Sequence, residues 1–297
     1  MKRLLTATLM LSALCLGALS SAHAIKVVAT IPDLAFFAKE IGGSKATVTT
    51  ICPGTVNPHF LETKPSHVEA IANADLFLEV GLALDLWGVS LRRAAANKRM
   101  VVITTTRGCT VLEKPKGPVD PSQGHLHPQG NPHLWLHPGN AMIICSNILA
   151  GFKAADPKNS AYYTDNAREL LEKIKSSAKK WSKQLAPCKG AGYVSYHPSY
   201  EYFADFAGLR KIATIEPKPG VPPPSGRVAE VLKLVKANNV KLILQEPYYP
   251  SGAAKAVAAA TEARFILAPT LSGSLPGTDT WFDMMQYLVD KVVSALK

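Results

Sequence analysis

Short apolar runs rich in β-branched residues alternate with helical patterns along the first part of the chain. The runs cover residues 25–31, 46–51, 76–80 and 100–104, and their composition indicates strands. Between them, apolar positions recur with the spacing of amphipathic helices in residues 34–41, 66–74 and 86–96. Ser66 and Glu69 match a capping box, which predicts where one of these helices begins. Strands that alternate with helices predict a parallel sheet covered by helices.

The alternation stops at a polar stretch, residues 105–130, and resumes further along. Two helical patterns come first, at 139–155 and at 160–185. Strands are then predicted at 192–196, 211–215, 240–245 and 265–267, with helices at 200–207, 227–238, 251–263 and 279–296. The fold class is therefore α/β, with two Rossmann-like lobes that each hold a four-stranded parallel sheet. We expect an N-terminal lobe at 25–158, a linking helix at 159–187 and a C-terminal lobe at 188–297.

The first residues have the order of a secretory signal peptide. Lys2 and Arg3 precede an apolar run over residues 4–19, and the small residues Ala22 and Ala24 flank His23. The run is shorter than the roughly 20 residues that a membrane span requires. We expect residues 1–24 to be removed by cleavage after Ala24, which makes the mature protein periplasmic.

The charge of the chain changes this picture little. Loss of Lys2 and Arg3 lowers the formal net charge from +11 to +9. The remaining basic residues are scattered, and their densest group lies on the predicted helix 160–185, which favours a solvated face. An exported protein also has little access to nucleic acid, so no nucleic-acid partner is expected.

Four cysteines remain after cleavage, namely Cys52, Cys109, Cys145 and Cys188. An even number of cysteines in an oxidising compartment favours disulfide bonds, and four cysteines allow three pairings. The sequence does not select one of them. A thiolate zinc site is disfavoured because no two cysteines have C-x-x-C spacing.

Three histidines stand beside prolines at predicted ends of elements. Asn-Pro-His occurs at residues 57–59 and again at 131–133, and His197 is followed by Pro198 directly after a predicted strand. Proline restricts its own φ and that of the residue before it, so these histidines are expected at rigid corners. Ligands of open parallel sheets bind beyond the carboxyl ends of the strands, where His59, His133, His197 and Asp279 are all expected. Three imidazoles and one carboxylate suit Zn²⁺, although Mn²⁺ or Fe²⁺ could occupy the same set.

The residues around these positions resemble the zinc/manganese solute-binding proteins of bacterial ABC transporters (cluster A-I, ZnuA/TroA-like). The resemblance is carried by these segments: Asn57-Pro58-His59 with Glu62, Pro65 and Ser66; Ala74-Asp75-Leu76; Val80-Gly81-Leu82; Asn131-Pro132-His133-Leu134-Trp135-Leu136; Tyr196-His197 with Tyr202-Phe203; Gln245-Glu246-Pro247; and Gly277-Thr278-Asp279-Thr280-Trp281.

The resemblance implies a fold, a site and a function. The fold is two α/β lobes joined by one long rigid helix. The site has His59, His133, His197 and Asp279 in its four ligand positions. Histidine at the third position favours Zn(II) as the transported ligand over Mn(II). The implied function is capture of zinc between the lobes of a periplasmic monomer and delivery to an ABC transporter membrane permease; a periplasmic zinc chaperone is a further candidate partner.

Three further residues are accessory candidates. Glu246 ends a predicted strand and could accept the second ring N–H of a ligand histidine, or it could cap a neighbouring helix. His125 and His127 stand where zinc-specific members of the family have a long histidine-rich loop. They could capture zinc transiently, or they could belong to a solvated loop without function. His137, four residues after His133, is expected not to be a ligand because the segment between them suggests a turn.

Other functions remain as alternatives. A manganese or iron binding protein of the same family, or a metal-binding surface adhesin, would use the same fold. A zinc hydrolase is disfavoured because a fourth protein ligand would fill the position that catalytic zinc keeps for water. The sequence also contains neither H-E-x-x-H nor G-x-S-x-G. The chain is therefore not expected to be an enzyme.

Overall fold

The computed structural model describes residues 24–115, 127–218 and 220–297 and holds two parallel sheets. Residues 1–23 of the expected signal peptide and His125 lie outside the described residues. The first sheet has the order β2-β1-β3-β4. Its strands are β1 (Ile25–Ala29), β2 (Ala46–Thr50), β3 (Leu76–Glu79) and β4 (Val101–Thr104). The helices between them are α1 (Pro32–Gly42), α2 (Pro65–Ala72) and α3 (Leu86–Ala95).

The second sheet repeats the topology of the first, with the order β6-β5-β7-β8 and parallel pairing throughout. Its strands are β5 (Gly192–Ser195), β6 (Arg210–Thr214), β7 (Leu242–Gln245) and β8 (Arg264–Leu267). The connecting helices are α6 (Glu201–Ala207), α7 (Ser225–Ala237) and α8 (Gly252–Ala259), and α9 (Trp281–Leu296) ends the chain. The predicted fold of two four-stranded parallel sheets flanked by helices is confirmed.

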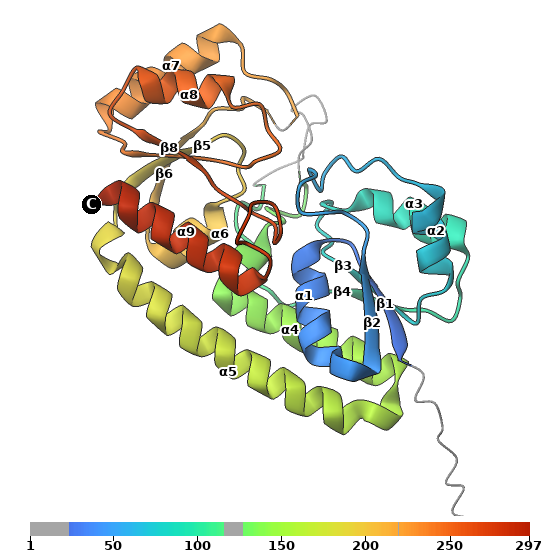
Figure 1. The fold of residues 1–297 in the computed structure, drawn as a ribbon. Helices are drawn as coiled ribbons and strands as arrows, with labels where there is room; N and C mark the ends of the chain where they lie inside the picture. The colour runs from blue at the N-terminus through green and yellow to red at the C-terminus, as the bar shows by residue number, and fades with distance from the viewer. Residues whose placement is uncertain (1–23, 116–126, 219) are drawn as a thin grey trace, which may run out of the picture.

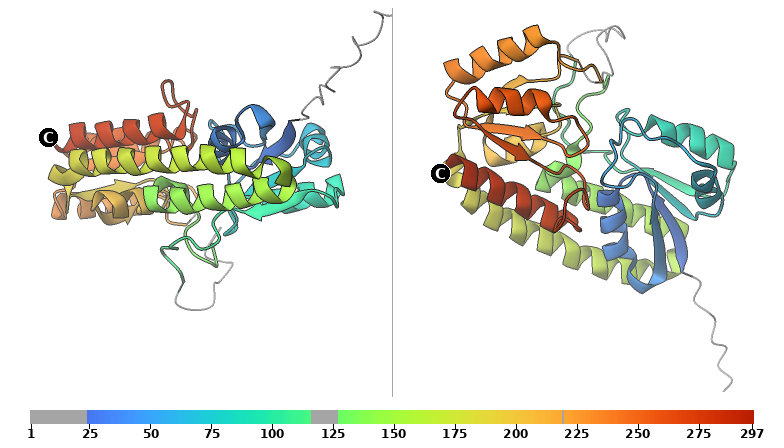
Figure 2. Two further views of the ribbon diagram at one scale, coloured as in Figure 1. Left: turned by 90° about the horizontal axis from the view of Figure 1, so that it is seen from below. Right: turned by 45° about the horizontal axis from the view of Figure 1, so that its top comes forward.

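The long helix α5 (Ser160–Leu185) runs along both lobes (Figure 1). It follows α4 (Pro138–Ala155) and packs against α4, α1 and α9. Its buried residues recur at helical spacing and form one face, so α5 lies on the other helices along its whole length. The view from below in Figure 2 shows the same helix extending from the first lobe to the second. These buried residues are Tyr163, Ala167, Leu170, Ile174, Trp181 and Leu185.

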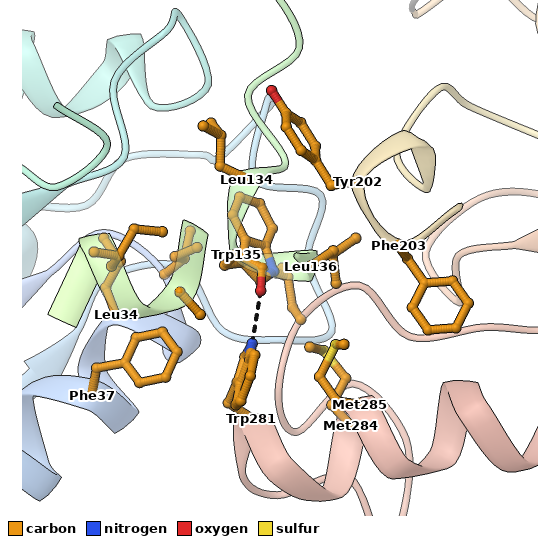
Figure 3. Packing of buried hydrophobic residues seen from close by; sticks show 14 of the residues in the cluster. Leu34, Phe37, Leu134, Trp135, Leu136, Tyr202, Phe203, Trp281, Met284 and Met285 are labelled. Carbon is orange, nitrogen blue, oxygen red and sulfur yellow. Dashed lines mark hydrogen bonds between the residues drawn. The ribbon is translucent and has the colours of Figure 1, made fainter. Parts of the chain in front are cut away.

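One hydrophobic cluster continues from one lobe into the other. Trp135, on the short 3₁₀ helix η3 (Leu134–Leu136), is fully buried and donates its indole N–H to the carbonyl of Thr270 at 2.6 Å. Its own carbonyl accepts the indole N–H of Trp281 at 2.9 Å (Figure 3). Phe37 of α1 packs against Trp281, with ring centroids 5.4 Å apart. The lobes are therefore joined by packed aromatic side chains as well as by α5.

The predicted start of one helix is wrong. Helix α2 begins at Pro65, not at Ser66, and its first turn is closed by His67, whose Nδ1 accepts the backbone N–H of Lys64 at 3.2 Å. Pro65 favours the first helical position because its φ is already helical and its missing N–H is not needed there. The N-cap is therefore Lys64, and Ser66 and Glu69 lie two residues too late to cap the helix.

The predicted disulfides are not formed, since all four cysteines are free. Each thiol lies in its own environment: Cys52 Sγ is 3.6 Å from the carbonyl oxygen of Pro53, and Cys109 Sγ is 3.8 Å from that of Asn140. Burial raises the pKa of the Cys52 thiol to about 12 and that of Cys109 to about 11, which keeps both protonated.

Within the described ranges, no helix combines the length and the hydrophobicity that a bilayer span requires.

A buried carboxyl group also joins the lobes. Asp33, in the first turn of α1, accepts the hydroxyl of Ser272 at 2.7 Å and its backbone N–H at 3.3 Å. Ser272 lies between β8 and α9, in the second lobe. Burial raises the pKa of Asp33 to about 7, while the hydrogen bonds from Ser272 partly oppose that rise.

This carboxyl should make stability depend on pH. Because the pKa of Asp33 is higher in the folded state than in the unfolded state, the folded protein holds this proton more tightly. The contribution of Asp33 to the free energy of unfolding is therefore full below about pH 4 and is lost as pH rises through 7. The loss could reach about 4 kcal/mol, an upper limit because the N-terminus of α1 favours the charged form. Urea unfolding between pH 4 and 8 should show a smaller decline for Asp33→Asn than for the wild type. Equal slopes would contradict this assignment.

Candidate metal site

The three predicted histidines lie outside the helices and strands and come from both lobes. His59 lies in the segment between β2 and α2, and His133 directly precedes η3. His197 follows the end of β5, a central strand of the second sheet, after one residue. In both Asn-Pro-His segments the asparagine side chain accepts the backbone N–H of the histidine, at 3.0 Å for Asn57 and 3.1 Å for Asn131. The repeated motif therefore builds the same turn twice.

The three imidazoles converge on one point. Their side chains are 7%, 1% and 2% exposed in the order His59, His133 and His197. The ring centroids are 5.2 Å apart for His59 and His133, 5.2 Å for His59 and His197, and 5.7 Å for His133 and His197. One ring nitrogen from each can be chosen so that all three lie within 4.8 Å of one another.

The closest pair of nitrogens fits a tetrahedral metal site. His59 Nε2 and His133 Nε2 are 3.3 Å apart. Two nitrogens that each lie about 2.05 Å from a tetrahedral Zn²⁺ would be separated by about 3.3 Å. The described residues therefore hold a nitrogen-rich group whose spacing suits one divalent ion between the lobes.

Hydrogen bonds fix the orientation of two of the rings. The Nδ1 of His133 lies 2.9 Å from Asn131 Oδ1, and the Nδ1 of His197 lies 2.5 Å from Glu216 Oε2. Each oxygen accepts a proton from Nδ1, which leaves the lone pair of the ring on Nε2. The Nε2 atom of His197 is buried and has no hydrogen-bond partner among the described residues. A metal ion would supply the partner that this nitrogen lacks.

The surroundings keep His133 uncharged. Burial lowers its pKa well below the ordinary value, and the nearby His197 and His127 lower it further. A metal binds the neutral imidazole, so burial removes the competing proton at neutral pH.

Glu216, which the sequence reasoning missed, takes the place predicted for Glu246. Glu216, His197 and Glu246 follow the adjacent strands β6, β5 and β7, so all three lie at one edge of the sheet. Glu216 contacts the ring of His197, whereas Glu246 accepts the hydroxyl of Ser199. Of the two roles considered for Glu246, the hydrogen bond from a ligand histidine is therefore not formed among the described residues. Burial raises the pKa of Glu246 to about 7, and its Oε2 has no hydrogen-bond partner among the described residues.

Asp279 is not brought to the three histidines. Its side chain is exposed, and it is not part of the histidine cluster. The prediction placed it at the start of the last helix, but Thr280 is the residue that caps α9. The Thr280 hydroxyl accepts the backbone N–H of Asp283 at 3.1 Å, and Asp283 Oδ2 accepts the backbone N–H of Thr280 at 3.2 Å. Asp279 thus precedes the cap.

Two other histidines lie close to the predicted site residues in sequence. His127 packs its ring on that of His59, with centroids 4.9 Å apart and planes at 35°. His137 is a helix cap: its Nδ1 accepts the backbone N–H of Gly139 at 2.9 Å at the start of α4. His137 Nε2 also lies 3.8 Å from Asp205 Oδ2. The ring of His137 is therefore engaged at the helix start.

A pocket of about 410 Å³ adjoins the histidine cluster. Its lining includes Asn57, which holds the turn of His59, and Glu216, which holds the ring of His197. Phe60 lies at the same pocket and is 54% exposed. Two of the residues that hold the imidazoles in place thus line this pocket.

Comparison with known proteins places the chain in one family. The model of the family described as "ZnuA: Zinc-uptake complex component A periplasmic" matches residues 27–295. The high-affinity zinc uptake system protein ZnuA of Bacillus subtilis is 25% identical over 257 residues, which are 86% of this chain and 81% of that protein. The zinc-binding lipoprotein AdcA of Streptococcus pneumoniae is 26% identical over 237 residues. That match covers 79% of this chain but only 46% of AdcA, so the chain spans about half the length of that relative.

A solved structure shows the same fold. The crystal structure of a protein titled ZnuA superimposes with a TM-score of 0.80 at 24% sequence identity, and the alignment covers 92% of this chain and all of the other.

Proposed function

This chain belongs to the family of periplasmic zinc-uptake component A proteins, and from that premise we propose that it captures Zn²⁺ between its lobes and delivers it to the membrane permease of an ABC transporter. The observation that carries the proposal is the cluster of three buried imidazoles, two from the first lobe and one from the second. We assign His59, His133 and His197 as ligands through Nε2. Asp279 is left out because its side chain is exposed.

The donor set supports zinc over manganese. Imidazole nitrogens suit Zn²⁺, whereas Mn²⁺ prefers carboxylate, carbonyl and water oxygens. The relatives from Bacillus and Streptococcus carry zinc in their names, which agrees with this preference. We propose the metal as cargo of a binding protein, not as the cofactor of an enzyme.

The remaining parts of the proposal concern the architecture and the compartment. Residues 25–158 and 188–297 would act as the two lobes, with residues 159–187 as the helix between them. Export by residues 1–24 would place the protein in the periplasm as a monomer, where the permease, and a zinc chaperone if one takes part, could reach the cleft. The fold is consistent with limited hinge motion because α5 packs along both lobes.

A titration tests the binding step. Protein stripped of metal should bind one Zn²⁺ tightly in competition with a chelator of known affinity, and Mn²⁺ should compete poorly. A strain that lacks the gene should grow poorly in chelator-treated medium and recover with the wild-type gene, but not with a gene in which all three histidines are alanine. Tight manganese binding with weak zinc binding would overturn the choice of metal. Full recovery by the triple variant would overturn the transport function.

Glu216 should contribute to affinity without touching the metal. It accepts the Nδ1 proton of His197 at 2.5 Å, and both side chains are 2% exposed. Loss of such a partner typically lowers metal affinity by about 10–100-fold because the ring loses its orientation and basicity. Glu216→Ala should fall in that range in the zinc competition assay. Glu216→Gln should lose less because the amide oxygen still accepts the proton.

The matched control for Glu216 is Glu230→Gln, which changes an exposed glutamate of α7 that pairs with Arg227. This variant should bind zinc as the wild type does. Wild-type affinity in Glu216→Ala would show that the carboxylate does not orient the ligand ring.

A further inference from the structure

The outer side of α5 carries a dense group of lysines. Residues 173–189, which are the C-terminal half of α5 and the residues that follow it, contain six lysines and no aspartate or glutamate. All six are exposed, and none of them belongs to an ion pair among the described residues. This basic face of α5 comprises Lys173, Lys175, Lys179, Lys180, Lys183 and Lys189.

Helix geometry places three of these lysines in one line that points away from the protein. Lys175, Lys179 and Lys183 are four residues apart, so their side chains share one side of α5 over about 12 Å. The buried residues Ile174 and Trp181 lie on the opposite side of the helix. The helix forms the lower edge of the molecule in Figure 1 and lies in front of the other elements in the view from below in Figure 2. The basic face is therefore open to solvent.

The stability of the helix does not account for this arrangement. Like charges four residues apart on a helix repel each other, so the pairs Lys175–Lys179 and Lys179–Lys183 weaken α5. The helix dipole favours basic residues in the last turn, which contains Lys183. The charges of Lys175 and Lys179 are thus stabilised neither by the dipole nor by an ion pair among the described residues.

Two further lysines widen the basic face toward α9. Lys173 Nζ lies 4.5 Å from the ring centroid of Phe282, and Lys180 Nζ donates to Gln286 Oε1 at 3.2 Å. Asp290 of α9 comes near this side, but its carboxylate accepts the side-chain amide of Gln286 at 2.8 Å. The two lysines are therefore held beside the line of three without a carboxylate to neutralise them.

The composition of the basic face favours a membrane surface over a protein partner. Protein interfaces are centred on aromatic and arginine side chains, and lysine is depleted from them. The one aromatic residue of segment 173–189 is Trp181, which is 2% exposed, and the segment contains no arginine. A layer of anionic headgroups needs no such anchors, because its surface potential attracts each nearby lysine.

We propose that the basic face of α5 binds the surface of a membrane that contains anionic phospholipids. The contact is electrostatic and peripheral, because no large apolar side chain is exposed on segment 173–189 for insertion into the bilayer. It uses none of the residues that line the pocket beside the histidine cluster, so that pocket stays free. The contact holds the exported protein beside the membrane in which the proposed permease lies.

The test measures how the purified protein co-sediments with vesicles of phosphatidylcholine alone and with vesicles of equal parts phosphatidylcholine and phosphatidylglycerol. The wild type should bind the mixed vesicles, should not bind phosphatidylcholine alone, and should be released as salt screens the charges. Each lysine near an anionic surface contributes about fivefold to binding. The variant with Lys175→Glu, Lys179→Glu and Lys183→Glu should therefore bind the mixed vesicles at least about 100-fold more weakly.

The matched control changes the net charge by the same amount on other surfaces. It carries Lys98→Glu, Lys233→Glu and Lys236→Glu, which replace three exposed lysines outside α5, and it should keep most of the vesicle binding. Unchanged circular dichroism spectra and zinc affinity should show that both variants are folded. An equal loss in both variants would show that net charge alone drives binding and would overturn the proposal. Wild-type protein that fails to bind the mixed vesicles at physiological salt would also overturn it, and zinc capture would stand.

Discussion

Replacement of His197 with alanine is expected to lower the affinity for zinc by more than about 100-fold, which exceeds the loss typical of an outer hydrogen-bond partner. His197 supplies the nitrogen from the second lobe, and the other two imidazoles of the cluster come from the first. In the proposed site, its removal deletes a metal–nitrogen bond, and it leaves Glu216, which is 2% exposed, without the ring that it holds. Competition with a chelator measures the effect.

His59→Ala and His133→Ala should cause losses of similar size, because we propose that all three nitrogens bind the same ion. His67→Ala serves as the control for removal of a histidine, and circular dichroism should show that each variant remains folded. If two of the three site variants kept near wild-type affinity, the ligand assignment would be refuted.

Replacement of Trp281 with alanine should cost about 3–5 kcal/mol of unfolding free energy. Trp281 is fully buried at the start of α9 and packs on Phe37 of the first lobe and on Trp181 of α5, with ring centroids 5.4 and 5.6 Å apart. Its loss would leave a cavity where three elements meet, and it would leave the carbonyl of Trp135 without its donor. For a chain of this size, Tm should fall by roughly 10 °C in a calorimetric scan of the metal-free protein.

A graded control separates packing from hydrogen bonding at this position. Trp281→Phe keeps most of the ring but removes the indole N–H, so its cost should be about 1–3 kcal/mol, the penalty for one buried carbonyl left unpaired. A Tm for Trp281→Ala within about 2 °C of the wild type would contradict the view that this residue holds the lobes together.

Most of the fold follows from the period of the apolar positions. The β-branched runs at 25–31 and 192–196 contain strands β1 and β5, and the long amphipathic pattern at 160–185 is the helix α5. These elements were predictable because their burial repeats with the geometry of the element itself. Strand ends were predicted less well, since β7 begins at Leu242 and not at residue 240.

The convergence of three histidines was also predictable, because proline marks the corners and parallel strands share an edge. Glu216 offered the same signal, since it follows β6 as Glu246 follows β7. The direction of each side chain decides which of the two glutamates reaches His197. Glu216 is held by a hydrogen bond from the Gly220 backbone N–H to its Oε1 at 2.6 Å. The sequence pattern reveals neither the side-chain direction nor this hydrogen bond.

The exposed position of Asp279 was not predicted from the sequence. Its exposure depends on which residue caps α9, and Thr280 with Asp283 forms a complete capping box one residue later. Neighbouring residues at a helix start point their side chains in different directions, so an error of one residue changes where a side chain points. Helix ends are also the part of an element that the sequence predicts least accurately. The position of His127 could not be predicted either, because it depends on the fold of a polar stretch without periodicity.

A crystal structure of the zinc-loaded protein, with anomalous scattering measured at the zinc absorption edge, tests the central claim most directly. We predict a single strong peak between the lobes, about 2.0–2.1 Å from Nε2 of His59, His133 and His197. A peak elsewhere in the molecule, or one that leaves two of these nitrogens beyond bonding distance, would contradict the account.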